Sequence, residues 1–191
     1  MKKLALLIAS IGVTFIAQAG MIWKPGFVVT VKGDTVRGDV KINDKKEFDL
    51  FRKVSMKLSE TENKTFKPEK LKEYTVDGQR FITKKIDDEF VFVKVVAHGQ
   101  VNLYLHQFEV YHGEEVRHDS EYYIEKSSTA SADSQPAKIK GSGKFKKLVA
   151  ELMNDHEELV KKVQSSDSKY EGEAIVEVIT EYNDWAKQNK G

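Results

Sequence analysis

Four of the five histidines in this sequence fall in one stretch of the chain, at His98, His106, His112 and His118. Imidazole is a common ligand of zinc and copper, and strand ends could bring several of these rings together. The spacings of 8, 6 and 6 residues match no metal motif, however, and two of the four stand beside a glycine at an apparent turn, where an exposed polar residue is expected. These histidines are therefore candidate ligands at most, and the sequence predicts no metal site.

The densest acidic patch lies next to His118 and comprises Glu114, Glu115, Asp119 and Glu121. A histidine among carboxylates could carry out acid–base chemistry, so a metal-dependent or hydrolytic enzyme using the 98–118 region is one hypothesis. A solvated, charged loop explains the same residues without chemistry. The sequence has no cysteine for a Cys–His nucleophile and no G-x-S-x-G elbow to expose a catalytic serine.

A Gly-Ser-Gly-Lys run at 141–144 invites comparison with a phosphate-binding loop. That motif needs a glycine where this chain has Lys138, and a serine or threonine where it has Phe145. The run is better interpreted as the junction between a linker and a helix. We therefore predict no catalytic residue and no cofactor.

The first 19 residues have the pattern of a secretion signal. Two lysines at positions 2 and 3 precede an apolar stretch, Leu4–Ile16, which ends at the small residues Ala17 and Ala19. We predict cleavage before Gly20, which carries no thiol for a lipid anchor. The alternative is a membrane anchor, but the apolar run is shorter than the roughly 20 residues that a spanning helix needs. The expected location is the periplasm or outside the cell.

Composition sets further limits on the partners. The chain has 31 Lys and Arg against 30 Asp and Glu; loss of the two leader lysines leaves 29 against 30, a net charge of −1 with histidine neutral. A balanced charge gives no general attraction to nucleic acid or anionic lipid. With no cysteine, no disulfide can staple the fold, so stability must come from a packed core. We expect an envelope protein or a small ligand as partner, with no nucleic acid and no membrane insertion after cleavage.

Period-2 patterns and turn signals predict a β-rich domain over 20–126. Gly33-Asp34 and Asp77-Gly78 lie between β-prone runs and indicate hairpins. The apolar run 90–96 predicts a central strand that is buried on both faces. A helical turn is predicted at Pro68, and polar loops at 59–67 and 113–120. Strands are expected at 27–31, 36–42, 48–58, 74–76, 80–83, 90–96, 101–105 with its continuation at 108–111, and 122–124.

The composition changes after residue 126. Residues 127–142 are rich in Ser, Ala and Gly and predict a flexible linker or a long surface loop. Residues 143–191 show helical spacing in three segments, with Ser142 as a possible N-cap. Such a short piece is small for a core of its own, so its apolar stripes should form a small bundle or pack on the β domain. The fold class is therefore α+β: an antiparallel meander or roll of about six to eight strands followed by a three-helix tail.

Several short motifs resemble a known group of proteins. The run 24–38 (KPGFVVTVKGDTVRG) resembles the opening of small exported envelope proteins from Bacteroidota. Residues 66–74, Phe90-Val91, 99–104 (GQVNLY) and the close at Tyr182-Asn183 are similar to that group as well. The resemblance implies a Gram-negative envelope address and no activity. Members often carry a Cys-Pro pair between the first two helices, where this chain has His156-Glu157.

Two functional hypotheses follow. The first is a non-enzymatic envelope protein that binds a partner or ligand, and it predicts an exposed aromatic patch or an open strand edge. The second is the enzyme at 98–118, which predicts acids and histidines converging in one pocket. The aromatic candidates for recognition are Trp23, Tyr104, Tyr111, Tyr122 and Tyr123, although packing within the sheet is the favoured explanation, because aromatic residues are intrinsic strand formers.

Overall fold

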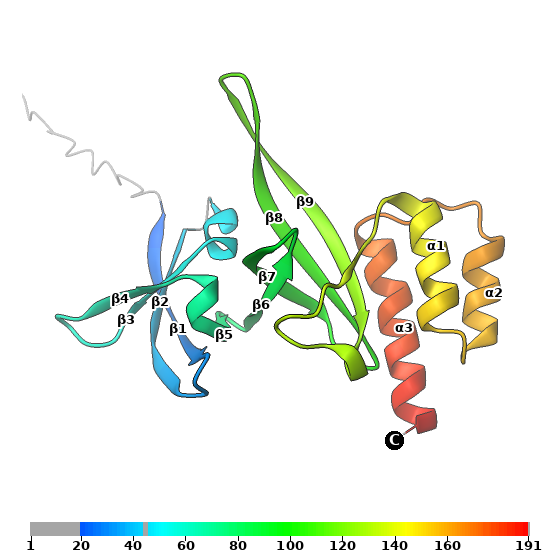
Figure 1. The fold of residues 1–191 in the computed structure, drawn as a ribbon, viewed down its shortest axis with the longest axis horizontal. Coiled ribbons are helices and arrows are strands. Elements are labelled where there is room, and N and C mark those ends of the chain that lie inside the picture. The colour runs from blue at the N-terminus through cyan, green and yellow to red at the C-terminus, as the bar shows by residue number, and fades with distance from the viewer. Residues whose placement is uncertain (1–19, 44–45, 191) are drawn as a thin grey trace, which may run out of the picture.

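The computed structural model describes residues 20–43 and 46–190, so the predicted leader, with Ala17 and Ala19, lies outside the described residues. The described chain forms a ten-stranded antiparallel sheet followed by three helices (Figure 1). The α+β prediction is confirmed, whereas the expected six to eight strands are too few. The strands are β1 (Met21–Thr30), β2 (Thr35–Asn43), β3 (Val54–Lys57), β4 (Asn63–Phe66), β5 (Leu71–Val76), β6 (Gln79–Ile86), β7 (Glu89–Ala97), β8 (Val101–His112), β9 (Glu115–Lys126) and β10 (Ala137–Lys138).

The sheet consists of two meanders joined side by side. Strands β1–β4 form one and β5–β10 the other, and β1 pairs with β5 to give the order β10-β9-β8-β7-β6-β5-β1-β2-β3-β4. Both predicted hairpins are present, between β1 and β2 and between β5 and β6. In the second, Asp77 and Gly78 both have positive φ, 50° and 76°, as a two-residue turn with the twist of a β-hairpin requires.

Gly26 and Gly38 face each other across β1 and β2. A Cβ at Gly26 would collide with the carbonyl of Thr75 on β5, and one at Gly38 with the carbonyl of Lys57 on β3. The glycines therefore allow four strands to approach closely, which gives these two residues of the 24–38 motif a packing role.

Two predictions in the first half of the domain are wrong. Residues 48–58 do not form one strand, because Glu47–Phe51 is a 3-10 helix, η1, and β3 begins only at Val54. This 3-10 helix buries three side chains, Phe48, Leu50 and Phe51. Their apolar spacing therefore reflects insertion into the core and not the alternating faces of a strand. The polar loop expected at 59–67 contains β4, of which Phe66 alone is buried. The helical turn at Pro68 is confirmed as η2 (Pro68–Lys70).

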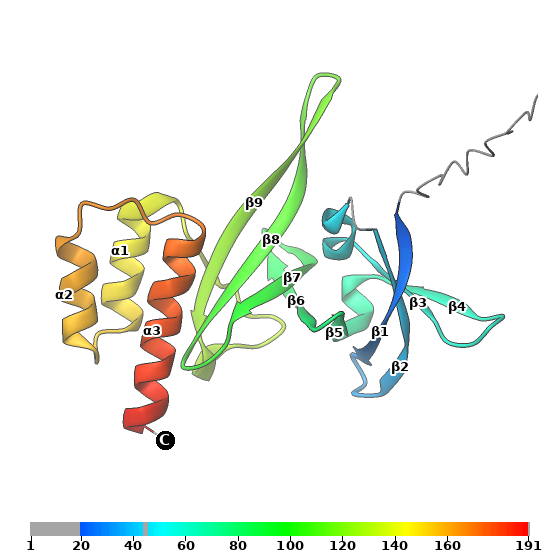
Figure 2. The same cartoon turned by 180° about the vertical axis from the view of Figure 1, so that it is seen from behind.

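The loop predicted at 113–120 is also wrong. Strands β8 and β9 run in unbroken register from Val101–Lys126 to His112–Glu115 and turn at Gly113. This hairpin projects well beyond the neighbouring strands (Figures 1 and 2). Residues 115–120 of β9 are exposed and largely charged, so the apolar alternation that identifies a strand is missing there.

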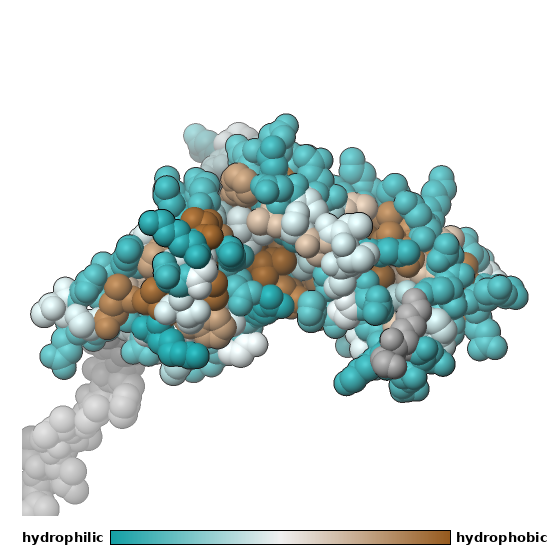
Figure 3. Space-filling view, turned by 60° about the horizontal axis from the view of Figure 1, so that its bottom comes forward, coloured by the Kyte–Doolittle hydropathy of each residue, from teal (hydrophilic) through white to brown (hydrophobic). Residues whose placement is uncertain are grey.

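Three apolar clusters fill the molecule. The first lies within the curled β1–β7 sheet and η1, the second between the helices and the ends of β8 and β9, and the third on the other face of β6–β9. The predicted central strand β7 contributes to both faces, because Phe92 belongs to the first cluster and Val93 to the third. Figure 3 shows a mainly hydrophilic surface, with hydrophobic side chains gathered over the β1–β4 part and at the centre.

The helices α1 (Gly141–Leu152), α2 (Glu157–Ser165) and α3 (Glu173–Lys190) pack on the sheet. In α3, the Asn183 amide donates to the carbonyl of Val101 (2.8 Å) and accepts from its N–H (3.0 Å). A Cβ at Gly99 would collide with Asn183. Ser142 is no N-cap: it lies inside α1, and its hydroxyl accepts a hydrogen bond from the N–H of Tyr170 (2.8 Å).

The segment 127–142 contains a 3-10 turn, η3 (Ser127–Thr129), and strand β10, which pairs with β9 at Tyr123 and Ile124. Ala137 and Ile139 pack against the helical cluster. This segment therefore makes specific contacts with the sheet on its way to α1.

Candidate functional site

The four histidines of the 98–118 region occupy different surroundings. His98 is exposed after β7, and His112 is exposed beside the hairpin turn. His118 stacks on Phe48 of η1, with 4.8 Å between ring centroids. In the part of the chain that the structure describes, no three His, Cys, Asp or Glu side chains are arranged to hold a metal ion.

His106 is the most enclosed of the four. It lies on β8 opposite Glu121 of β9, and its ring contacts Phe51 and Phe108, with centroid separations of 6.3 and 5.6 Å. Burial lowers the pKa of His106, and the nearby Glu121 carboxylate opposes this effect only in part. The imidazole is therefore held in its neutral form around pH 7.

Glu121 is the centre of a polar group beside His106. Lys138 donates to its Oε1, and the Tyr123 hydroxyl donates to its Oε2 at 2.7 Å. Burial alone would raise the pKa of Glu121, but these hydrogen bonds outweigh it and the pKa is lowered. Together with Asp87 these residues line a cavity of about 380 Å³. Both carboxylate oxygens are engaged, so Glu121 is poorly placed to accept a proton from a substrate.

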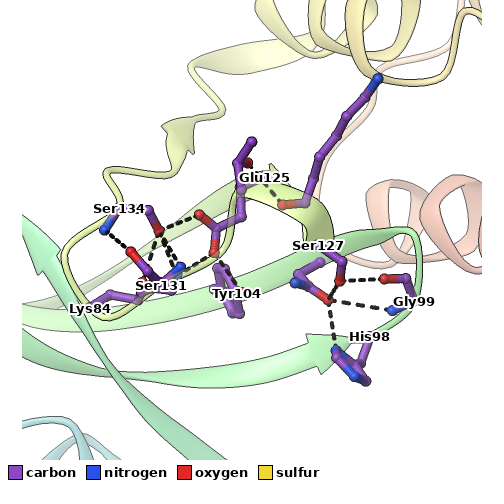
Figure 4. Close-up of polar contacts among 11 residues, drawn as sticks. Lys84, His98, Gly99, Tyr104, Glu125, Ser127, Ser131 and Ser134 are labelled. Carbon is purple, nitrogen blue, oxygen red and sulfur yellow. Dashed lines mark hydrogen bonds and ion pairs between the residues drawn. The ribbon is translucent and has the colours of Figure 1, made fainter.

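A buried ion pair lies on the same face of the sheet (Figure 4). Lys84 of β6 and Glu125 of β9 are 2% and 6% exposed. The Lys84 ammonium donates to Glu125, to the carbonyl of Ser131 (2.6 Å) and to the hydroxyl of Ser134 (2.9 Å). The carboxylate also accepts from the Tyr104 hydroxyl (2.8 Å) and the Ser134 hydroxyl (2.6 Å). The ammonium thus has three acceptors and the carboxylate has three donors, so both charges are satisfied. These contacts fix the 131–134 segment to the sheet.

Asn102, the register partner of Glu125, organises the turn between β7 and β8. Its Oδ1 lies 2.7 Å from Nδ1 of His98 and accepts from the hydroxyl of Ser127 at 3.2 Å. Ser127 also donates to the carbonyl of Gly99 at 2.6 Å. Next to these contacts is an open cavity of about 340 Å³, lined by strands β5–β8 and residues 130–132.

A cavity of about 710 Å³ forms a cleft where β7 and β8 diverge. These strands pair from Ala97–Leu103 to Lys94–Leu105 and no further. Beyond that point, residues 89–93 of β7 pair with β6 alone and residues 106–112 of β8 pair with β9 alone. Two strand edges with free backbone groups therefore face the cleft.

Aromatic side chains line much of this cleft. They are Phe48, Phe51, Phe90, His106, Phe108 and Tyr111. Phe90 is 37% and Tyr111 67% exposed, so large apolar surfaces remain open to solvent. Arg52, which directly follows η1, contacts Glu109 of β8 at 3.5 Å. The arrangement suits an extended chain with apolar side chains.

Of the aromatic candidates identified in the sequence, Tyr111 lines this cleft and Trp23 is 39% exposed on β1. Tyr104 and Tyr123 are buried. The cleft and the Lys84–Glu125 pair were not predicted from the sequence. The FVFV run at 90–93 was a sequence signal for the cleft. All four of its residues are apolar, yet Phe90 stays exposed and Val91 is only partly buried.

None of the helices in the described residues is both long and apolar enough to span a bilayer. In comparisons with known proteins, no family model, no curated protein and no solved structure matches this chain.

Proposed function

We propose that this chain is an exported, non-enzymatic envelope protein that binds an extended polypeptide segment of a partner in the cleft between β7 and β8. The observation that carries the proposal is the pair of unpaired strand edges lined by aromatic side chains. An added strand would satisfy the backbone groups of the β8 edge, and its alternate side chains would meet the aromatic wall.

The two outermost edges of the described sheet are protected against strand addition. The outer edge of β9 is charged, with Glu115, Arg117 and Asp119 in alternation, and β10 covers its inner end. At the opposite end of the sheet, β4 is four residues long and carries Lys64. Charge and shortness are the usual protections of natural edge strands. The cleft edges carry one carboxylate each, Glu89 on β7 and Glu109 on β8, and are otherwise largely apolar or aromatic, which supports the cleft as the place where a partner strand adds.

The export part of the proposal rests on the leader pattern at 1–19. Intact mass of the protein purified from the envelope fraction should correspond to a chain that begins at Gly20. A mass that retains Met1, with the protein in the cytosol, would contradict this assignment.

The binding experiment uses peptides selected from a random library on the folded protein. Bound peptides should protect the backbone amides of 106–111 from hydrogen exchange. The double variant Phe90→Ser/Tyr111→Ser should weaken binding about tenfold or more, because aromatic anchors dominate such interfaces. The matched control is Val116→Ser, which removes an apolar residue that is 49% exposed on β9 and does not line the cleft. Equal loss in the control, or peptides that leave these amides unprotected, would overturn the proposal.

The alternative is a metal-dependent or hydrolytic enzyme in the 98–118 region. Its support is that His106 and Glu121 border one cavity. Against it, Glu121 is occupied by Lys138 and Tyr123, and the other three histidines lie elsewhere. Hydrolysis of a general ester that is lost in His106→Phe and kept in His112→Phe would favour the enzyme.

A further inference from the structure

A second cavity lies over the paired part of β7 and β8, on the face that carries Lys84 and Glu125. Its volume of about 340 Å³ falls in the range of sites for small molecules. Strands β5–β8 form its floor, and residues 130–132 form a wall. No function proposed above makes use of it.

Charge is unevenly distributed around this cavity. Lys72 and Arg80 lie at its rim, and Glu73 is the one carboxylate among its lining residues. A single oxygen of Glu73 takes both contacts with Arg80, at 3.0 Å from Nε and 2.5 Å from Nη2. Lys72 forms no ion pair with any described residue. The rim therefore has a surplus of positive charge.

The floor of the cavity is apolar. Ile82 of β6 and Val95 of β7 line it and are only half-buried, although they pack against the Tyr104 cluster. Side chains of this kind gain free energy when an apolar group covers them, about 25 cal/mol per Å² removed from water. The cavity thus combines a cationic rim with an uncovered apolar floor.

The wall is fixed before any ligand arrives. Lys84 holds the carbonyl of Ser131 at 2.6 Å, and the hydroxyl of Ser134 binds both Lys84 and Glu125. A preformed wall lowers the entropy that binding must offset. It also gives a reason for burying an ion pair at this position.

We propose that this cavity binds a small organic anion, whose carboxylate or phosphate lies between Lys72 and Arg80 and whose apolar body rests on Ile82 and Val95. The site is separate from the cleft, so either proposal can fail without the other.

The test is titration of the full mature chain with three probes, benzoate, inorganic phosphate and benzyl alcohol, followed by calorimetry and amide chemical shifts. Benzoate should bind with a dissociation constant of about 1 mM, and shifts should centre on β6 and β7. Benzyl alcohol lacks the charge and should bind at least about tenfold more weakly, a difference of about 1.4 kcal/mol. Phosphate should compete with benzoate.

The variant Lys72→Gln/Arg80→Gln should weaken benzoate about tenfold. The matched control, Lys32→Gln/Arg37→Gln, removes the same charge from exposed positions of the β1–β2 hairpin and should leave binding unchanged. Lys72→Arg should retain binding. Absence of saturable benzoate binding at about 20 mM, equal binding of benzyl alcohol, or equal loss in the control pair would each overturn the proposal.

Discussion

Replacement of Lys84 by methionine tests whether the buried ion pair holds the 131–134 segment. The variant removes the ammonium and leaves the Glu125 carboxylate buried with two donors, Tyr104 and Ser134. Removing one partner of a buried pair typically costs about 3–5 kcal/mol, and the two remaining hydroxyls place this case near about 3 kcal/mol. For a domain of this size the melting temperature should fall by about 6–12 °C.

Chemical denaturation of the wild type, Lys84→Met, Glu125→Leu and the double variant measures the coupling between the two side chains. The double variant should be less destabilised than the sum of the single variants, because it leaves no unpaired buried charge. The control is Lys94→Met, which breaks a half-exposed pair with Glu47 (2.9 Å) and should cost less than about 1 kcal/mol. If Lys84→Met costs no more than this control, or if the single effects are additive, the assigned role of the pair is wrong.

Three further predictions concern stability. Asn183→Ala, which strips both hydrogen bonds from the Val101 backbone, should cost about 2 kcal/mol in urea unfolding, whereas the exposed Asn189→Ala should change little; equal effects would contradict the docking role. Gly26→Ala should cost about 1–3 kcal/mol because its Cβ meets the Thr75 carbonyl, and a neutral result would refute that contact. Because burial lowers the pKa of His106, the unfolded chain takes up that proton more readily, so stability should fall as pH drops below 6.5; His106→Phe should flatten this slope, and an unchanged slope would disprove the cause.

Local sequence signals correctly predicted the elements whose conformation is determined by residues close together in the chain. Asp77-Gly78 marks a hairpin because positive φ at both residues is a property of the turn itself. The helix pattern in α1 is equally local, since Phe145, Leu148 and Val149 share one buried face. The predictions of secondary structure failed where tertiary contacts determine the conformation. In η1 three apolar residues insert together into the interior, and the β8–β9 hairpin has polar residues because it stands clear of any core.

The candidate sites depend on contacts that no spacing in the sequence encodes. Lys84 and Glu125 lie 41 residues apart, and each follows an ordinary alternation on its strand. The grouping of histidines was misleading for the same reason. His106 and His118 fall on strands whose side chains alternate between faces, so closeness in sequence did not bring them into one site.

The two proposed sites follow from a single irregularity in the sheet. From Ala97 to Lys94 of β7, backbone pairing with β8 closes the surface and provides a floor for the small cavity. Beyond Lys94 that pairing stops, and η1 fills part of the gap, with Phe51 between Phe81 and the ring of His106 (centroid separations of 5.4 and 6.3 Å). Phe51 thus links the aromatic side chains of β6 and β8 where the β7–β8 ladder has ended. Phe51 and His106 also line the cleft that we propose as the site for a partner strand.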